Sequence, residues 1–332
     1  MFRRAHAWDW EKISWVVAIE VGVIATLASF VLPGGDDLYR YYLPFANGCL
    51  ECGFVPYFAH WLLWPLSLIP PRLAWPACTA GTAAGFLVLC RYTGVNPALM
   101  MLSFPTMGQF WLGQIDVIVA AGLVIALLAG SPYLQGLGIV LALVKPQVAG
   151  LAITVLLVHQ SARNVGRMLL LPTGVLAASL FVFGIDWPLR WLTYSAQTVP
   201  VHIWRKAGID LWPYGLVSLV ALILMDQLES RYKTALIIPA LATPFLGVYS
   251  YMVFLLFRAP PWSVPASYGW LLFFPLWGSA SLRLAWLLPA AMLVESVYTA
   301  LKRRRQPTTK EQENRIAREV QSKPPPGDAD GG

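Results

Sequence analysis

The chain has 332 residues, of which 57% are hydrophobic and only 12% are charged, and its mean hydropathy is +0.59. This composition excludes a water-soluble globular protein and indicates a polytopic membrane protein. The formal net charge is +7, but the basic residues stand at the ends of apolar segments, as in "MFRR", "RNVGR", "ESRYK" and "LKRRR". That distribution is typical of membrane topology, so we expect no nucleic-acid partner.

Residues 13–32 form the first apolar segment, and they are long enough to cross a bilayer. The run is too long for a signal-peptide core and no small-residue cleavage pattern follows it, which predicts a retained signal anchor. Eleven more apolar segments follow, at residues 77–90, 98–112, 115–130, 133–144, 148–158, 168–184, 214–225, 234–243, 248–257, 268–281 and 284–301. The sequence therefore predicts an all-α fold, a transmembrane helix bundle of about 12 spans.

The proline-punctuated stretch "YFAHWLLWPLSLIPP" decides the topology. If it lies along the membrane surface or dips into it without crossing, the basic stretches all fall on one side, which the positive-inside rule makes cytoplasmic. Five unusual stretches then share the external side, namely "GGDDLYRYY", "LGQID", "VKPQ", residues 186–212 and "ATPFLG".

These patterns predict a transmembrane catalytic domain over residues 1–301, with an external loop and juxtamembrane helices at residues 33–72. The polar, proline- and glycine-ended residues 302–332 are expected to form a disordered tail. We expect the chain to reside in the cell membrane with both termini in the cytoplasm.

Asp36 and Asp37 stand at the outer mouth of the first span. Gly34 and Gly35 precede them and allow a sharp turn of the backbone, and the amphipathic stretch "LYRYYLPF" follows. A carboxylate held there beside a hydrophobic groove is well placed to take a proton from a hydroxyl group of an acceptor. The alternative is that both carboxylates only solvate the loop.

Two further polar features interrupt apolar segments. Lys145 lies between two apolar runs and Pro146 follows it, so its ammonium could bind an anionic headgroup or could simply extend to the interface. In "LGQID", Gln114 and Asp116 separate two apolar helices, and Asp116 either caps the second helix or belongs to a site.

The external stretches also contain histidines, cysteines and tryptophans. His60 and His202 are expected to be exposed, and Trp204, between His202 and Arg205, could offer a face on which a sugar ring stacks or could anchor the chain at the interface. Cys49 and Cys52 form a C-x-x-C without nearby histidines, which favours a local disulfide or two free thiols over a metal site.

The order of an aspartate with a tyrosine-bearing helix, then "GQID", "GLGIVLALVKPQ" and a late "TPF" over residues 15–251 resembles the GT-C class of lipid-linked glycosyltransferases. Within that class the chain most resembles glycosyltransferase family 87, the polyprenyl-phosphate-mannose-dependent mannosyltransferases. The family pattern of aspartate, leucine, two residues and tyrosine falls on Asp37, Leu38 and Tyr41. The resemblance therefore implies that Asp37, rather than its neighbour Asp36, is the general base.

The resemblance implies a cell-envelope enzyme that transfers a hexose, with inversion, from a polyprenyl-phosphate sugar to a lipid, glycan or glycolipid acceptor, with no cofactor or metal. We expect Lys145, with Arg40 and Arg205, to bind the donor phosphate. The expected substrate-binding residues are Tyr41, Gln114, Asp116, His60, His202 and Trp204. The family usually has asparagine where this chain has Asp116.

Two other classes of function remain open from the sequence. A transporter or lipid flippase would bind its substrate at broken helices near the middle of the membrane. A scaffold subunit would keep the fold without activity. The clustering of the polar features on one face favours the enzyme over the transporter.

Overall fold

The computed structural model describes residues 2–198, 211, 213–243 and 246–305 of the chain, and every regular element in them is helical. This confirms the predicted all-α fold class. The longest helices are α1 (Phe2–Ala28), α4 (Pro71–Thr93), α10 (Ala162–Phe183) and α19 (Leu287–Arg305). Helices of intermediate length are α6 (Phe104–Leu112), α7 (Asp116–Leu128), α8 (Pro132–Ala142), α9 (Pro146–Val158), α11 (Trp187–Thr198) and α14 (Leu228–Ile237).

The remaining elements are short. The short α-helices are α2 (Leu43–Ala46), α3 (Ala59–Leu63), α5 (Pro97–Leu102), α13 (Ala221–Leu224), α15 (Pro239–Ala242), α16 (Met252–Leu255), α17 (Ser263–Ser267) and α18 (Phe274–Trp277). One π-helix, η1 (Leu38–Tyr42), occurs near the start of the chain. The 3-10 helices are η2 (Leu50–Cys52), η3 (Trp64–Leu68), η4 (Tyr214–Val220), η5 (Val248–Tyr251), η6 (Gly269–Phe273) and η7 (Gly278–Trp286).

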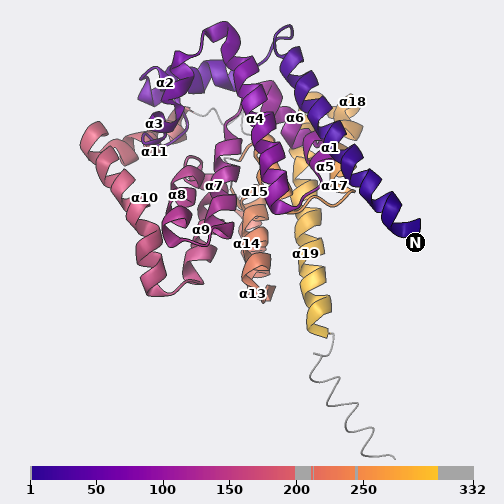
Figure 1. Cartoon of the computed structure of the whole chain (residues 1–332). Helices are drawn as coiled ribbons and strands as arrows, with labels where there is room; N and C mark the ends of the chain where they lie inside the picture. Colours follow the sequence, from indigo (N-terminus) through magenta and orange to yellow (C-terminus); the bar gives the residue numbers. More distant parts are fainter. Residues whose placement is uncertain (1, 199–210, 212, 244–245, 306–332) are drawn as a thin grey trace, which may run out of the picture.

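The helices give the molecule two distinct ends (Figure 1). The upper end in this view holds α2, α3 and the end of α10. The lower end holds α13, the start of α14 and the last turns of α19. Between these ends α1 packs against α4 and α5, while α8 packs against both α7 and α10. The long helices α4 and α10 thus connect the two ends.

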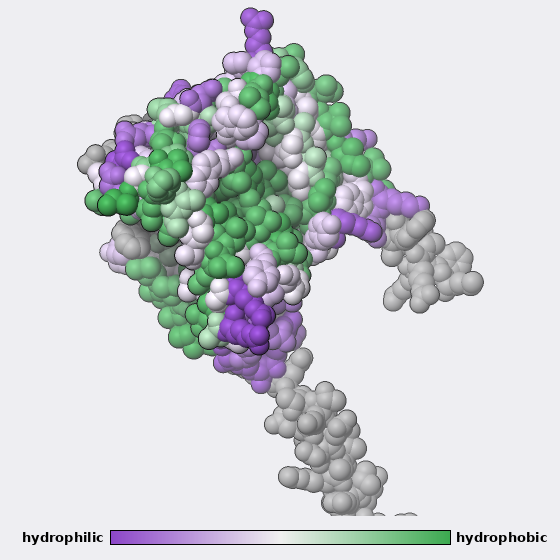
Figure 2. Space-filling view, turned by 60° about the vertical axis from the view of Figure 1, so that its left-hand side comes forward, coloured by the Kyte–Doolittle hydropathy of each residue, from purple (hydrophilic) through white to green (hydrophobic). Residues whose placement is uncertain are grey.

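The surface supports a membrane location. Figure 2 shows a broad apolar zone across the middle of the molecule, with polar residues gathered above it and at the lower end. Three stretches of the described residues are long and apolar enough to cross a bilayer, namely Pro71–Thr93, Ala162–Phe183 and Gly269–Arg304. Several other predicted spans are shorter helices or 3-10 turns, so the count of about 12 spans is not confirmed.

Local sequence explains where the structure departs from the predicted segments. The predicted segment at residues 98–112 is divided at Ser103, whose backbone is extended and whose neighbour Phe104 begins α6 with Pro105 in its first turn. Proline lacks the N–H that a continuous helix would need there. At the other end of the chain, residues 302–305 continue α19 and are helical, so the disordered tail predicted from residue 302 is wrong for these four residues. Residues 306–332 lie outside the described part of the chain.

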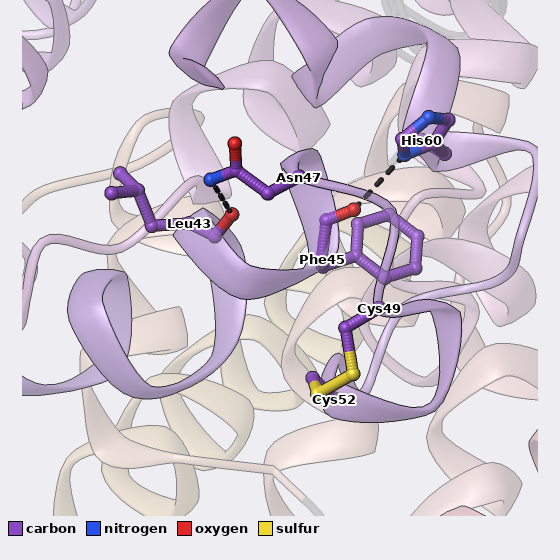
Figure 3. Close-up of a disulfide and its surroundings, with 6 residues drawn as sticks. All are labelled: Leu43, Phe45, Asn47, Cys49, Cys52 and His60. Atoms are coloured by element: carbon purple, nitrogen blue, oxygen red, sulfur yellow. Dashed lines mark hydrogen bonds between the residues drawn. A yellow bond between two sulfur atoms is a disulfide. The ribbon is translucent and has the colours of Figure 1, made fainter.

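Between α1 and α4 the chain forms only short helical turns, and a disulfide links Cys49 to Cys52 (Figure 3). Of the two alternatives for this C-x-x-C, the structure has the disulfide. His60 is half-buried and its Nδ1 lies 2.9 Å from the carbonyl oxygen of Phe45 (Figure 3), so the prediction of an exposed histidine is wrong. The packing of α3 against α2 accounts for this burial, because it brings the imidazole onto the Phe45 ring.

Candidate active site

Asp37 is positioned by a tight turn after α1. Gly35 has a φ of 72°, a conformation that glycine adopts readily, and its N–H donates to the carbonyl oxygen of Trp111 over 2.7 Å. A side chain at position 35 would meet Trp75, whose indole N–H donates to the carbonyl of Phe110 over 2.7 Å. The chain makes the sharp turn that the Gly-Gly pair predicted, and these contacts fix the turn to α4 and α6. The π-helix η1 begins directly after Asp37.

The "GQID" turn brings Gln114 to Asp37. α6 ends at Gly113, which has a φ of 68°, and a Cβ added there would lie 2.7 Å from the Cβ of Leu38. Only glycine satisfies both the backbone conformation and this close approach. The turn between α6 and α7 consequently lies against the start of η1.

Gln114 is fully buried and is hydrogen-bonded on both sides of its amide. Its Nε2 donates to Oδ2 of Asp37. Its Oε1 accepts from the hydroxyl of Tyr42 over 2.8 Å and from Nζ of Lys145 over 2.7 Å. Because an ammonium can only donate, the oxygen of Gln114 must face Lys145, and this fixes the amide nitrogen toward Asp37.

Lys145 lies at the break between α8 and α9, and Pro146 is the first residue of α9. The side chain of Lys145 is only 6% exposed, and Nζ is 3.0 Å from Oδ2 of Asp116. The ring centroid of Tyr249 is 5.1 Å from Nζ, a cation–π distance. Two of the three ammonium hydrogens are thus used by Gln114 and Asp116, which leaves one for a further acceptor.

Asp116 is the first residue of α7 and is fully buried. The residue that precedes the helix is Ile115, so the alternative that Asp116 caps α7 is wrong. Besides Lys145, its carboxylate accepts from Nε2 of Gln109 over 2.5 Å and from Oγ of Ser250 over 3.2 Å. Gln109 also donates to the carbonyl of Tyr249 over 3.0 Å. A buried carboxylate with this many partners is held in one orientation.

We refer to these connected residues as the Asp37 cluster, which comprises Asp37, Tyr42, Gln109, Gln114, Asp116, Lys145, Tyr249 and Ser250. Sequence reasoning found Asp37, Gln114, Asp116 and Lys145 and missed the other four. A glutamine inside the apolar helix "FPTMGQFWL" was a signal that could have found Gln109. No comparable signal marks Tyr249 and Ser250, because both reach the cluster through contacts distant in sequence.

Burial sets the protonation behaviour of Asp37. Loss of solvent raises the pKa of its carboxyl to about 6, and the nearby charges of Asp36 and Asp116 act in the same direction. The ammonium of Lys145 and, to a smaller extent, the guanidinium of Arg40 oppose this increase in the pKa. The carboxylate is therefore ionised at neutral pH, yet it is a stronger base than an ordinary aspartate.

The other predicted site residues do not join the cluster in the described part of the chain. Asp36 forms an exposed ion pair with Arg40 over 2.7 Å. Tyr41 packs edge-on against Phe54 with ring centroids 4.7 Å apart, and His60 is held by Phe45 as described above. His202, Trp204 and Arg205 lie outside the described residues.

Comparison with known proteins adds one finding to this geometry. The model of glycosyltransferase family 87 matches residues 55–275, about two thirds of the chain. The chain belongs to glycosyltransferase family 87. The match includes Gln114, Asp116 and Lys145, whereas Asp37 precedes it. Searches of curated proteins and of solved structures found no match.

Membership of family 87 supports the transfer of a sugar by a membrane protein. The Asp37 cluster contains the groups that such a reaction needs from a protein. These are a carboxylate base of raised pKa and, two hydrogen bonds away, a buried cation with one N–H to spare.

Proposed function

We propose that this family 87 chain transfers a hexose, specifically mannose, from a polyprenyl-phosphate donor to a hydroxyl group of a lipid or glycan acceptor. The reaction takes place at the external face of the cell membrane, and both termini are cytoplasmic. The observation that carries the proposal is the half-buried Asp37 carboxylate, held by Gln114 and raised in pKa to about 6.

In this reaction the acceptor oxygen forms a bond to the anomeric carbon of the sugar as the bond from that carbon to the lipid phosphate breaks. The proton of the acceptor hydroxyl moves to the carboxylate of Asp37, and the electron pair of the broken bond leaves on the phosphate. Attack from the face opposite the leaving group inverts the anomeric carbon. The donor carries its own leaving group, so the step requires no cofactor.

The donor phosphate gains charge as it leaves, so a cation near it stabilises the transition state. Lys145 is assigned to this role through its remaining N–H, because charge-assisted bonds to phosphate are strong. Arg40 and Arg205 are assigned as additional cations from the external segments. Tyr41, His60, His202 and Trp204 are assigned to the substrates that approach from the same side.

Replacement of Asp37 by asparagine tests the proposal. Asparagine keeps the shape of the side chain and a hydrogen-bond acceptor for Gln114, but it accepts no proton. We expect Asp37→Asn to lower transfer of radiolabelled mannose from polyprenyl-phosphate-mannose by about 10²- to 10⁴-fold, the usual contribution of positioned proton transfer. The measurement uses membranes that contain equal amounts of each variant.

Asp36→Asn is the matched control, because Asp36 is the adjacent carboxylate and is exposed in its pair with Arg40. We expect this variant to retain most of the activity. If Asp36→Asn abolishes transfer while Asp37→Asn keeps it, the base has been assigned to the wrong residue. If neither variant changes transfer, a carboxylate base in this turn is excluded.

The sidedness of the site can be tested independently of activity. Single cysteines at positions 36 and 163, in a background without other cysteines, are labelled with a membrane-impermeant maleimide. We expect position 36 to react in intact cells and position 163, at the start of α10, to react only after permeabilisation. Reaction of position 36 only after permeabilisation would contradict the external site and favour the transporter. Reaction of both positions in intact cells would contradict the predicted topology.

A further inference from the structure

A second polar site lies at the lower end of the molecule, away from the Asp37 cluster. A partly open cavity of about 770 Å³ is lined by the turn between α13 and α14, by α14 itself, by Arg258 after α16 and by the end of α19. Two of the basic stretches that the sequence analysis assigned to topology, residues 231–233 and 302–305, contribute residues to its walls. The fold thus gathers charges that are far apart in the sequence. We call this space the lower polar cavity.

The charge of the lower polar cavity favours an anion. Its ionisable lining residues are the cations Lys233, Arg258, Arg303 and Arg304 and the carboxylates Asp226 and Glu229, so four positive charges face two negative ones. Three cations have carboxylate partners, since Lys233 pairs with Glu229, Arg304 with Asp226, and Arg258 with Glu295 outside the lining.

Arg303 differs from these three cations. It forms no ion pair with any residue in the described part of the chain, although it lines the same cavity. Its charge acts on the carboxylate of Glu229 without direct pairing, which leaves its guanidinium N–H groups for a ligand. An arginine binds a phosphate group well because it presents several N–H donors in a plane.

An apolar cavity adjoins the polar one. It has a volume of about 400 Å³, is lined by Leu127, Leu128, Leu228 and Phe257 together with Tyr92 and Thr93, and shares Glu229 and Lys233 with the lower polar cavity. We call it the lower apolar cavity. A basic space beside an apolar one, with two lining residues in common, fits a molecule with an anionic head and a hydrocarbon chain.

We propose that the two lower cavities bind one anionic phospholipid. Its phosphate binds Arg303 and the neighbouring Arg304 in the lower polar cavity, and an acyl chain lies along Leu127, Leu128 and Phe257 in the lower apolar cavity. Bound in this way, the lipid connects α19 to α14 and to the end of α7. Free phosphate shares the chemistry of the head but leaves the apolar cavity unfilled. This site is independent of the function proposed above.

Lipid binding to the full-length chain, delipidated in detergent, is the test. Native mass spectrometry would compare phosphatidylglycerol, phosphatidylcholine with the same acyl chains, and glycerol 1-phosphate. We expect phosphatidylglycerol to bind at least about tenfold more tightly than either of the others, because only it supplies both the net charge and the chain. Equal binding of phosphatidylcholine overturns the anionic preference. Equal binding of glycerol 1-phosphate overturns the lipid and leaves a phosphate site.

Matched variants locate the binding site. We expect Arg303→Ala to weaken phosphatidylglycerol binding about fivefold, the usual effect of one basic residue near a membrane surface. Lys302→Ala is its control, because Lys302 is exposed on the same helix and does not line the cavity. Equal effects of these two variants would show non-specific attraction and overturn the proposal.

The apolar half of the site has its own pair of variants. Leu128 lines the lower apolar cavity and is 53% exposed, and Leu134 is exposed to the same extent on α8 without lining either cavity. We expect Leu128→Gln to weaken phosphatidylglycerol binding severalfold and Leu134→Gln to leave it unchanged. If Leu128→Gln has no effect, the acyl chain does not occupy this cavity.

Discussion

The Asp37 cluster and the lower polar cavity both contain carboxylates paired with cations, but they place these pairs in different surroundings. In the cluster, the side chains of Lys145 and Asp116 are 6% and 0% exposed. At the lower end, the side chains of Arg304 and Asp226 are 41% and 60% exposed. The same kind of ion pair is therefore almost inaccessible to solvent in the Asp37 cluster and solvent-exposed at the lower end.

Because of this difference in exposure, the free-energy cost of desolvating the ion pair is large in the Asp37 cluster and small at the lower end. Removal of a charge from water is expensive, so a buried pair persists only when hydrogen bonds satisfy its remaining polar atoms. The cluster meets this requirement with Gln109, Gln114 and Ser250. The exposed pairs need no such support and can exchange partners. The buried pair therefore has a fixed geometry, whereas the exposed pairs are suited to reversible binding of a ligand.

Breaking the buried pair should have the largest effect on stability. Lys145→Met keeps an unbranched side chain only one atom shorter but leaves the carboxylate of Asp116 buried without its cation. We expect the free energy of unfolding to fall by about 3–5 kcal/mol, with a lower midpoint in a thermal assay of the detergent-solubilised protein. The double variant Lys145→Met with Asp116→Asn removes both charges and should lose less. A double variant that is less stable than Lys145→Met would contradict this account.

Substitution at the contact between the "GQID" turn and η1 should have the next largest effect on stability. Gly113→Ala forces a left-handed backbone on alanine and places its Cβ 2.7 Å from that of Leu38. We expect a loss of about 2 kcal/mol in stability, and reduced transfer because Gln114 moves away from Asp37. Gly150→Ala in α9 is the control, since no atom lies near the added Cβ there. Equal thermal midpoints for both variants would show that the turn tolerates a side chain.

Acid should inactivate the enzyme through Asp37. The pKa of its carboxyl is raised to about 6, so the base is ionised above pH 6 and becomes protonated below it. We expect kcat/KM to fall about tenfold per unit of pH below 6. Because Lys145 lowers this pKa, Lys145→Met should move the acid limb of the profile to higher pH. A profile that stays flat down to pH 5 would exclude Asp37 as the titrating group.

Loss of the exposed ion pair between Arg304 and Asp226 should have the smallest effect on stability. Arg304→Ala removes the partner of Asp226, which then faces solvent. Exposed ion pairs contribute little to stability, so we expect no measurable change in the thermal midpoint or in transfer. If the thermal midpoint falls as far as that of Lys145→Met, the exposed and the buried ion pair contribute equally to stability, which would contradict this comparison.

The sequence predicted the fold class and four members of the cluster for physical reasons. Apolar segments of helical length indicate membrane helices, and Lys145 and Asp116 are conspicuous because charges are costly between such segments. The lengths of the helices were less predictable. Periodicity does not reveal that residues 98–112 divide at Ser103, or that residues 268–286 form mainly 3-10 helix, since packing decides those breaks.

The contacts within the cluster were beyond sequence reasoning for a different reason. Ser250 donates to Asp116 across 134 positions in the chain, and Gln109 reaches the carbonyl of Tyr249 across 140. No local pattern encodes such a pairing. The assignment of His60 as exposed was wrong for the same reason, because its burial depends on how α3 packs against α2.

The fixed amide of Gln114 also distinguishes the two carboxylate oxygens of Asp37, the base of the proposed reaction. Its Nε2 donates to Oδ2 of the carboxylate, and reversal of the amide is blocked because the ammonium of Lys145 can only donate and therefore requires its oxygen. Among the described residues none donates to Oδ1. Oδ1 is therefore the oxygen left open to an acceptor hydroxyl in the proposed reaction, in which Asp37 is the base. The two oxygens of a symmetric group are made inequivalent by an uncharged neighbour.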